Sequence, residues 1–157
     1  METMGDRRAR AMTPVRKACF GLSLIGVAVG IYLTIAHFTS SSILACPSQG
    51  IINCARVTSS QQSYFLKIPV ALWGLAFYLY LSVINSPWGF RQESLRVPRL
   101  GSMFLGVAFV LWLISAELLI IDSICLWCTV VHVVTIFIFA LVVHDYFSSP
   151  SSQIGGE

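Results

Sequence analysis

The sequence predicts an all-α membrane protein: a bundle of four transmembrane helices with a long extracytoplasmic loop and a short helix covering one end. Hydrophobic residues make up 56% of the 157 residues and charged residues 11%, and the mean hydropathy is +0.78, which is too apolar for an ordinary soluble domain. Four apolar runs approach the roughly 20 residues that one crossing requires. The ten Lys and Arg residues gather at the ends of these runs, so a membrane is the expected partner and nucleic acid is not.

The first helix is predicted over about residues 18–38, after a basic segment, residues 1–17, that we expect to be cytoplasmic and mostly disordered. The apolar run is too long for the core of a signal peptide, and no small-residue cleavage pattern follows it, so the helix is retained. Gly26 and Gly30 lie on one face and permit close helix contact. Cys19 is predicted to be a buried apolar residue.

The connection over residues 39–68 is rich in Ser, Gln and turn residues, and it carries Cys46 and Cys54. A loop this long in a small protein is usually functional. A cap formed by the Thr-Ser-Ser run at 58–60 predicts a short helix over 61–65, whose aromatic residues would rest at the membrane interface. We therefore expect the loop to lie over the bundle as a lid.

Three further helices are predicted, over about residues 69–85, 100–121 and 124–146. Pro69 suits the first turn of a helix, where a missing N–H has no cost. The connection between the second and third helices carries Arg91, Arg96 and Arg99 against a single acid, so the positive-inside rule places it in the cytoplasm and the 39–68 loop outside. Both termini are then cytoplasmic, and residues 147–157, rich in Ser and Gly, are predicted to be a disordered tail.

The fourth helix opens with the motif Cys125-Leu126-Trp127-Cys128. The first turn of a helix presents unpaired N–H groups and a positive dipole end, which stabilise the reactive thiolate form. Residues three apart share a face, so the two thiols can close a disulfide or pass electrons in sequence. The predicted topology puts this pair on the same extracytoplasmic face as the loop cysteines, where disulfides persist.

Two dithiol pairs on one side of a membrane make a thiol–disulfide relay possible. The electrons must end on a membrane-soluble acceptor, and a lipid quinone is the natural one because the sequence has no metal or flavin motif. A zinc site is an alternative for the thiols, although the seven residues between Cys46 and Cys54 are unusual for a ligand loop. A purely structural bridge between Cys125 and Cys128 is disfavoured, because it joins neighbouring turns and constrains little.

A polar stripe follows the thiols along the fourth helix, since Thr129, His132 and Thr135 recur at helical spacing on the face of the cysteines. Such a stripe in an apolar helix must point into the bundle. His132 lies one turn below Cys128 and could donate a hydrogen bond or a proton. The alternative is a histidine satisfied by Glu117 or a serine. The cap of this helix is predicted to be one of the two residues at 122–123.

These features resemble the vitamin K epoxide reductase family, in which a paired-cysteine loop follows the first of four spans and a C-x-x-C opens the fourth. The residues that carry the resemblance are Cys46, seven residues, Cys54-Ala-Arg-Val-Thr-Ser-Ser60, then Pro69 and Gly74, then Cys125-Leu-Trp-Cys128. The resemblance implies that the loop and its short helix cap an active site. It also implies that Cys128 faces a quinone of the ubiquinone, menaquinone or phylloquinone type. Cys125 would exchange disulfides with Cys54, and Cys46 would meet an external partner.

The implied function is oxidation of a thioredoxin-like extracytoplasmic partner, which supports disulfide-bond formation in proteins exported across a prokaryotic cytoplasmic membrane. No fused thioredoxin domain follows within the sequence, so the partner is expected to act in trans. Ser59 or Ser60 would match the family's loop hydroxyl near the active pair, and with Val70, Thr129 and His132 they are the candidate lining of the quinone pocket.

Three other functions stay open at this point. Vertebrate relatives that act on the epoxide carry a tyrosine and an asparagine where this sequence has His132 and Val70, so vitamin K epoxide reduction is one alternative to quinone reduction. A membrane metal-binding or metal-transport protein could use the four thiols as ligands. A redox sensor could switch its conformation through the same thiols without turnover.

Overall fold

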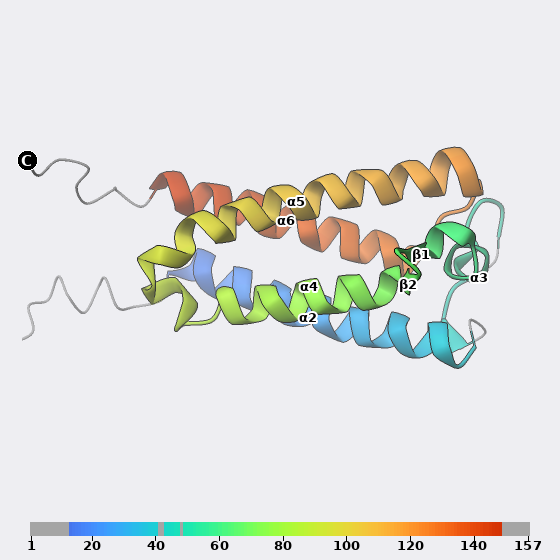
Figure 1. The fold of residues 1–157 in the computed structure, drawn as a ribbon, viewed down its shortest axis with the longest axis horizontal. Helices are drawn as coiled ribbons and strands as arrows, with labels where there is room; N and C mark the ends of the chain where they lie inside the picture. Colours follow the sequence, from blue (N-terminus) through green and yellow to red (C-terminus); the bar gives the residue numbers. More distant parts are fainter. Residues whose placement is uncertain (1–12, 41–42, 48, 149–157) are drawn as a thin grey trace, which may run out of the picture.

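The structure is a computed structural model that describes residues 13–40, 43–47 and 49–148. These residues form four long helices that run side by side, α2 (Pro14–Phe38), α4 (Val70–Ile84), α5 (Arg96–Ala116) and α6 (Leu126–Ser148) (Figure 1). By length and composition, α2, α6 and the helical stretch Glu93–Ile121 can each cross a membrane. Helix α4 has 15 residues, or about 22 Å at 1.5 Å per residue, against about 30 Å of hydrocarbon core. The predicted helical membrane fold is confirmed with three candidate spans, whereas a fourth crossing stays a prediction.

Several short elements lie between α2 and α4, all at one end of the bundle (Figure 1). They are the helix α3 (Cys54–Thr58), the 3-10 turn η2 (Gln61–Ser63) and the antiparallel strands β1 (Tyr64–Phe65) and β2 (Ile68–Pro69). The helix predicted over 61–65 is wrong at its end, because the aromatic residues there favour extended backbone. Leu66 and Lys67 take positive φ angles of 53° and 64°, which is the backbone of a tight hairpin turn.

The ends of the outer helices differ from the predicted boundaries. Helix α2 begins at Pro14 because the Thr13 side chain accepts a hydrogen bond from the Arg16 N–H, and proline fits the first turn. The predicted basic segment 1–17 is therefore helical from Pro14, and residues 1–12 lie outside the described residues. Helix α6 continues to Ser148, so the predicted tail cannot begin at 147, and residues 149–157 also lie outside the described residues.

The connection from α5 to α6 contains a π-helical turn, η5 (Glu117–Ile121). It ends at Asp122, which takes a left-handed conformation with φ of 52°. Asp122 therefore terminates one helix instead of capping the next. The first turn of α6 is capped by Cys125, whose Sγ accepts a hydrogen bond from the Cys128 N–H at 3.4 Å, so the cap predicted at residues 122–123 is two or three residues too early.

The helices pack around a core in which a side chain of α4 contacts both α2 and α6. Gly26 of α2 makes room for the Tyr78 ring of α4, which a Cβ atom at position 26 would overlap. The Tyr78 hydroxyl lies 2.9 Å from the Val131 carbonyl oxygen and 2.8 Å from the Thr135 hydroxyl, both on α6. Cys19 is fully buried in this core, as the sequence predicts.

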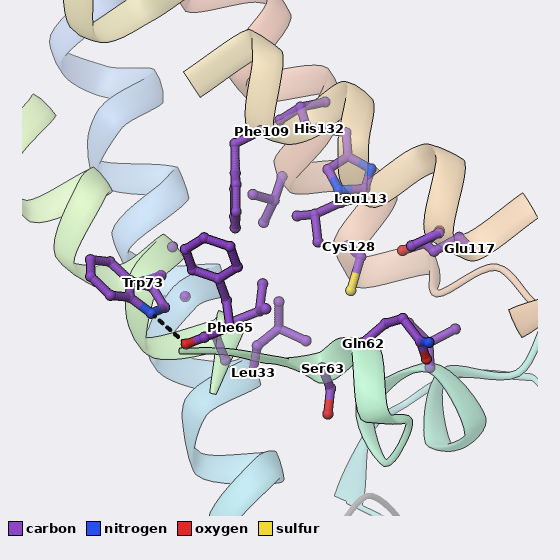
Figure 2. A pocket seen from close by; sticks show the side chains of 18 of the residues that line it. Leu33, Gln62, Ser63, Phe65, Trp73, Phe109, Leu113, Glu117, Cys128 and His132 are labelled. Atoms are coloured by element: carbon purple, nitrogen blue, oxygen red, sulfur yellow. Dashed lines mark hydrogen bonds between the residues drawn. The ribbon is translucent and has the colours of Figure 1, made fainter. Parts of the chain in front are cut away.

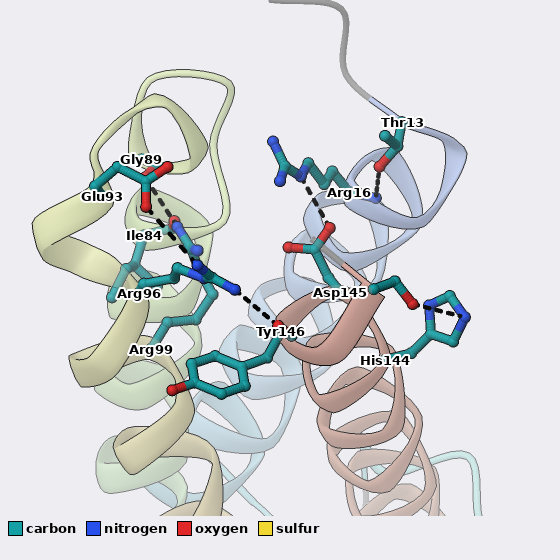
Figure 3. A network of polar contacts seen from close by, with 11 residues as sticks. Thr13, Arg16, Ile84, Gly89, Glu93, Arg96, Arg99, His144, Asp145 and Tyr146 are labelled. Carbon is teal, nitrogen blue, oxygen red and sulfur yellow. Dashed lines mark hydrogen bonds and ion pairs between the residues drawn. The ribbon is translucent and has the colours of Figure 1, made fainter. Parts of the chain in front are cut away.

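Charged side chains join the helices at the end away from the loop (Figure 3). Arg16 of α2 forms an ion pair with Asp145 of α6 at 2.9 Å. Arg99 of α5 is 4% exposed, and its guanidinium donates hydrogen bonds to the carbonyl oxygens of Ile84 and Gly89 at 2.8 and 2.9 Å. We call this region the arginine end, and the opposite one, with the loop, the cysteine end.

Candidate functional site

The cysteine end brings the four predicted cysteines into one cluster. Cys46 and Cys54 form a disulfide, with Cα atoms 6.1 Å apart, and Cys125 and Cys128 are free thiols. Cys54 and Cys125 are buried in the same hydrophobic cluster, and Cys46 and Cys128 are partly buried against it. In the part of the chain that the structure describes, no three His, Cys, Asp or Glu side chains are placed to hold a metal ion.

A short ladder of backbone hydrogen bonds fastens the loop to the start of α6. The Ile124 N–H donates to the Ile51 carbonyl at 2.8 Å, and the Asn53 N–H donates to the Ile124 carbonyl at 3.1 Å. Because Cys54 directly follows Asn53 and Cys125 directly follows Ile124, this ladder sets those two cysteines next to each other. Main-chain groups thus position Cys54 beside Cys125.

A second anchor holds the loop segment that carries Cys46. The Trp127 indole N–H, from inside the C-x-x-C motif, donates to the Ala45 carbonyl at 3.2 Å. The Tyr32 hydroxyl of α2 accepts from the Ala45 N–H at 3.0 Å and donates to the Ile43 carbonyl at 2.9 Å. The Tyr32 and Trp127 rings meet edge to face, 4.9 Å apart. Both sides of the disulfide are therefore tied to the bundle.

The first turn of α6 gives the two free thiols different properties. The pKa of Cys125 lies below that of a free cysteine, first because the Cys128 thiol donates a hydrogen bond to it, and then because the backbone N–H groups of Cys128 and Trp127 face its sulfur. Burial and the Glu117 carboxylate oppose this and raise the pKa. Cys125 is consequently the thiol that ionises more readily, which suits it to disulfide exchange.

An apolar cavity of about 390 Å³ lies beside the thiols, between α2, α4, α5 and α6 (Figure 2). Helices α4 and α5 make little contact with each other, which leaves this space open between them. The volume and the mostly apolar wall are typical of a small-molecule site with a few polar groups. Those polar groups are His37, Thr58, Ser60, Gln62, Ser63, Tyr78, Glu117, Cys128, His132 and Thr135.

The structure brings some of the predicted pocket residues to this cavity and not others. Ser60, Val70 and His132 line its wall. Thr129 does not, because one residue of helix turns the side chain by about 100° from Cys128; it is exposed, and its hydroxyl donates to the Cys125 carbonyl at 3.0 Å. Ser59 lies beside a separate hollow, and its hydroxyl donates to a carbonyl of α3 at 2.7 Å. Neither Thr129 nor Ser59 therefore lines this cavity.

His132 is 5% exposed and its ring lies on the cavity wall, one turn from Cys128 (Figure 2). Among the described residues, none hydrogen-bonds its imidazole. The alternative in which Glu117 or a serine satisfies this histidine is thus not what the structure shows. The ring nitrogens are available to a molecule inside the cavity.

The sequence reasoning missed an aromatic group at the mouth of the cavity. The Phe65 ring of the β1–β2 hairpin lies between Trp73 of α4 and Phe109 and Trp112 of α5, with ring centroids 5.7 to 6.2 Å apart. The Trp73 indole N–H donates to the Phe65 carbonyl at 3.2 Å (Figure 2). The spacing of 109 and 112, three apart on one helix face, could have indicated a shared aromatic surface. No comparable spacing in the sequence indicated that Phe65 of the hairpin joins this surface.

The fold and the site define a helical membrane protein with thiol–disulfide chemistry at one end of its bundle. Residues 17–143 match the sequence profile of the Vitamin K epoxide reductase family, and the chain belongs to this family. The family is one of oxidoreductases, and three helices can span a membrane, so the protein is an integral membrane enzyme of the oxidoreductase class. A search among curated proteins found no match.

Proposed function

We propose that the protein oxidises a thioredoxin-like dithiol partner outside the membrane and passes the electrons through two cysteine pairs to a lipid quinone. The observation that carries this proposal is the backbone ladder that holds Cys54 beside Cys125, while Cys128 lines the apolar cavity. One arrangement thereby links a disulfide in the loop to a thiol that faces a site for a lipid-soluble acceptor. The quinone would be of the ubiquinone, menaquinone or phylloquinone type.

The proposed topology places the cysteine end outside a prokaryotic cytoplasmic membrane and the arginine end inside. The start of α2 and the end of α6 lie together at the arginine end (Figure 1), which requires an even number of crossings. Helix α4 would be the fourth crossing, lengthened by the hairpin whose aromatic residues suit the interface. The excess of Arg at the arginine end agrees with the positive-inside rule, which favours a cytoplasmic location for it.

Electrons enter when a partner thiolate attacks the Cys46–Cys54 disulfide. Cys46 is the more exposed of the two, since Cys54 is 2% exposed, so attack at Cys46 releases the Cys54 thiolate. Cys54 then attacks Cys125 in a Cys125–Cys128 disulfide, and each exchange breaks one S–S bond and forms another. When the partner leaves oxidised and the Cys46–Cys54 bond closes again, the protein reaches the state of this structure, with both electrons on the inner pair.

The second half of the reaction takes place in the cavity. A quinone bound there would accept the two electrons of the inner thiols. Cys128 faces the space, and His132 can donate its ring N–H to a carbonyl oxygen. Ser60 lines the loop side of the cavity, where its hydroxyl donates to the Val57 carbonyl at 2.8 Å, so it would have to change partner to reach a bound carbonyl. With His132 and Val70 at the positions discussed above, no observation favours vitamin K epoxide over a quinone.

Quinol formation in proteoliposomes tests the proposal. Purified protein, a reduced thioredoxin-like protein and a quinone are mixed, and the absorbance of the quinone is followed. The wild type should form quinol, and Cys128→Ala should form none above background. Cys19→Ala is the matched control, because Cys19 is a free thiol buried in the core away from the cavity. Full activity of Cys128→Ala would refute the proposed function.

A further inference from the structure

Glu117 places a carboxyl group on the wall of the cavity. It belongs to the π-helical turn at the end of α5 and is 6% exposed. Figure 2 shows its carboxyl pointing toward the Cys128 sulfur. An acid within an apolar span is costly to keep and is by default a candidate for function, and π-turns are frequent at functional sites. From the sequence, Glu117 was considered only as a partner of His132.

Glu117 lies beside the two thiols, and two histidines line the same cavity. The backbone N–H of Cys125 faces the Glu117 carboxyl, and its charge is one of the effects that oppose the lowering of the pKa of Cys125. His132 of α6 and His37 of α2 lie on the same cavity wall. No Lys or Arg lines the cavity among the described residues, so Glu117 has no permanent counter-ion there.

The proposed reaction at Cys128 needs a nearby group that can accept a proton. Cys128 is a free thiol that lines the cavity, and the lowered pKa of Cys125 makes Cys125 the one that ionises first, so the sulfur that faces the cavity is the one that keeps its proton. A thiol must lose this proton before its sulfur can give up an electron pair. An acceptor on the cavity side can take this proton, and the Glu117 carboxyl points there.

We propose that Glu117 takes the proton from the Cys128 thiol and gives it to the nearer oxygen of the bound quinone. This inference rests on the proposed function. In the balanced reaction two S–H bonds break, the Cys125–Cys128 bond forms, and two electrons pass from the sulfurs to the quinone. One proton travels through Glu117. Cys125 releases the other to water, and the second oxygen takes one up from water.

The variant Glu117→Gln separates proton transfer from a purely electrostatic role, because the two predict opposite signs. Removing the negative charge lowers the pKa of Cys125, so thiol alkylation without quinone should begin at a lower pH than in the wild type. Reduction of a short-chain benzoquinone in a single turnover, started from the chemically reduced inner pair, should nevertheless fall about 100-fold, as for loss of a proton-transfer group. Glu93→Gln, an acid whose side chain is 89% exposed, is the matched control and should match the wild type in both measurements.

Two results would overturn the inference. One is a Glu117→Gln protein that reduces the quinone as fast as the wild type or faster, which would mean that the carboxylate acts only through its charge. The other is an alkylation profile that does not move, which would mean that no charged carboxylate stands beside the thiols. A wild type that forms no quinol refutes the proposed function instead, and the alkylation profile still reports on Glu117.

If Glu117→Gln does not fold, Glu117→Asp tests the inference instead. This variant keeps the charge but shortens the side chain by one carbon, so the alkylation profile should stay near that of the wild type. The single-turnover rate should fall about tenfold, because proton transfer depends on hydrogen-bond reach. An unchanged rate in Glu117→Asp would overturn the inference.

Discussion

At the arginine end of the bundle, charged side chains hold the helices together, whereas at the cysteine end backbone hydrogen bonds hold a loop against α6. The arginine end uses the Arg16–Asp145 ion pair and the buried guanidinium of Arg99. The cysteine end uses the ladder at Ile124 and the indole of Trp127. Both ion pairs that the described residues show lie at the arginine end.

The difference follows from what the proposed function requires of each end. Disulfide exchange changes the partners of the cysteine side chains, so the forces that keep the loop in place must not depend on those side chains. Main-chain hydrogen bonds meet this condition, because they persist whichever cysteines are joined. Nothing at the arginine end changes partners, so side-chain interactions can do the same work there.

The largest expected effect concerns which loop cysteine reaches α6. In a Cys46→Ala, Cys128→Ala double variant, mild oxidation should close a Cys54–Cys125 disulfide, because the ladder holds these residues adjacent. In the matched Cys54→Ala, Cys128→Ala variant, the Cys46–Cys125 bond should form about 1,000 times more slowly, since orientation supplies most of the rate of such reactions. Peptide mapping without reduction measures both, and equal rates would show that the ladder does not select the partner.

The next effect is on the stability of the arginine end. Arg99→Leu removes the donor to two buried carbonyl oxygens, Ile84 and Gly89, and should lower the free energy of unfolding by about 3 kcal/mol. Arg91→Leu, at an exposed position, should change it little. Thermal unfolding in detergent measures this, and quinol formation per folded molecule should stay that of the wild type. A loss of turnover without a loss of stability would contradict a purely structural role of this end.

A smaller effect is expected from the anchor at Ala45. Trp127→Phe keeps a ring against Tyr32 but loses the indole hydrogen bond, which contributes about 1 kcal/mol. Closure of the Cys54–Cys125 bond in the double variant should slow by about fivefold, because 1.4 kcal/mol corresponds to roughly tenfold. Trp88→Phe, whose exposed indole lies away from the loop, is the control. An unchanged rate would leave the ladder as the main determinant of loop position.

The smallest expected effect is a shift in the pH profile of Cys125 alkylation, with no change in the maximum rate. The lowered pKa of Cys125 keeps its thiolate present at lower pH than in a free cysteine, and the Cys128 thiol is the first cause. Cys128→Ala removes that donor, so the alkylation of Cys125 should begin at higher pH, whereas Cys128→Ser retains a donor and should shift it less. The measurement uses a Cys19→Ala background, in which Cys125 is the free thiol. A shift to lower pH would contradict the assigned hydrogen bond.

The sequence predicted much of the fold because long apolar runs and their basic flanks are local properties. Helices α2, α5 and α6 lie close to their predicted ranges, and both ends of α4 were placed within one residue. The hairpin was missed because Tyr64 and Phe65 follow a helical turn, and only the positive φ angles of the next two residues turn the chain back. The π-turn at Glu117 was missed because an apolar run does not encode the number of residues per turn.

The candidate site was likewise predicted only in part from the sequence. The C-x-x-C spacing and its order after the loop cysteines were enough to single out all four cysteines and the family. Spacing also placed His132 below Cys128, on the face that the cavity later showed. Thr129 does not line the cavity because a single residue turns a helix by about 100°, so the edge of a polar stripe depends on where the neighbouring helices stand.

The sequence by itself determined a membrane protein with two ordered cysteine pairs, because composition and spacing are written along the chain. Only the tertiary structure decided that Ile51 and Asn53 pair with Ile124, and so which loop cysteine lies beside Cys125. It also decided that Glu117 and His132 share one cavity with Cys128. The physical reason is that hydrogen bonds between distant segments, and the rotation of each helix about its axis, depend on how all the helices pack together.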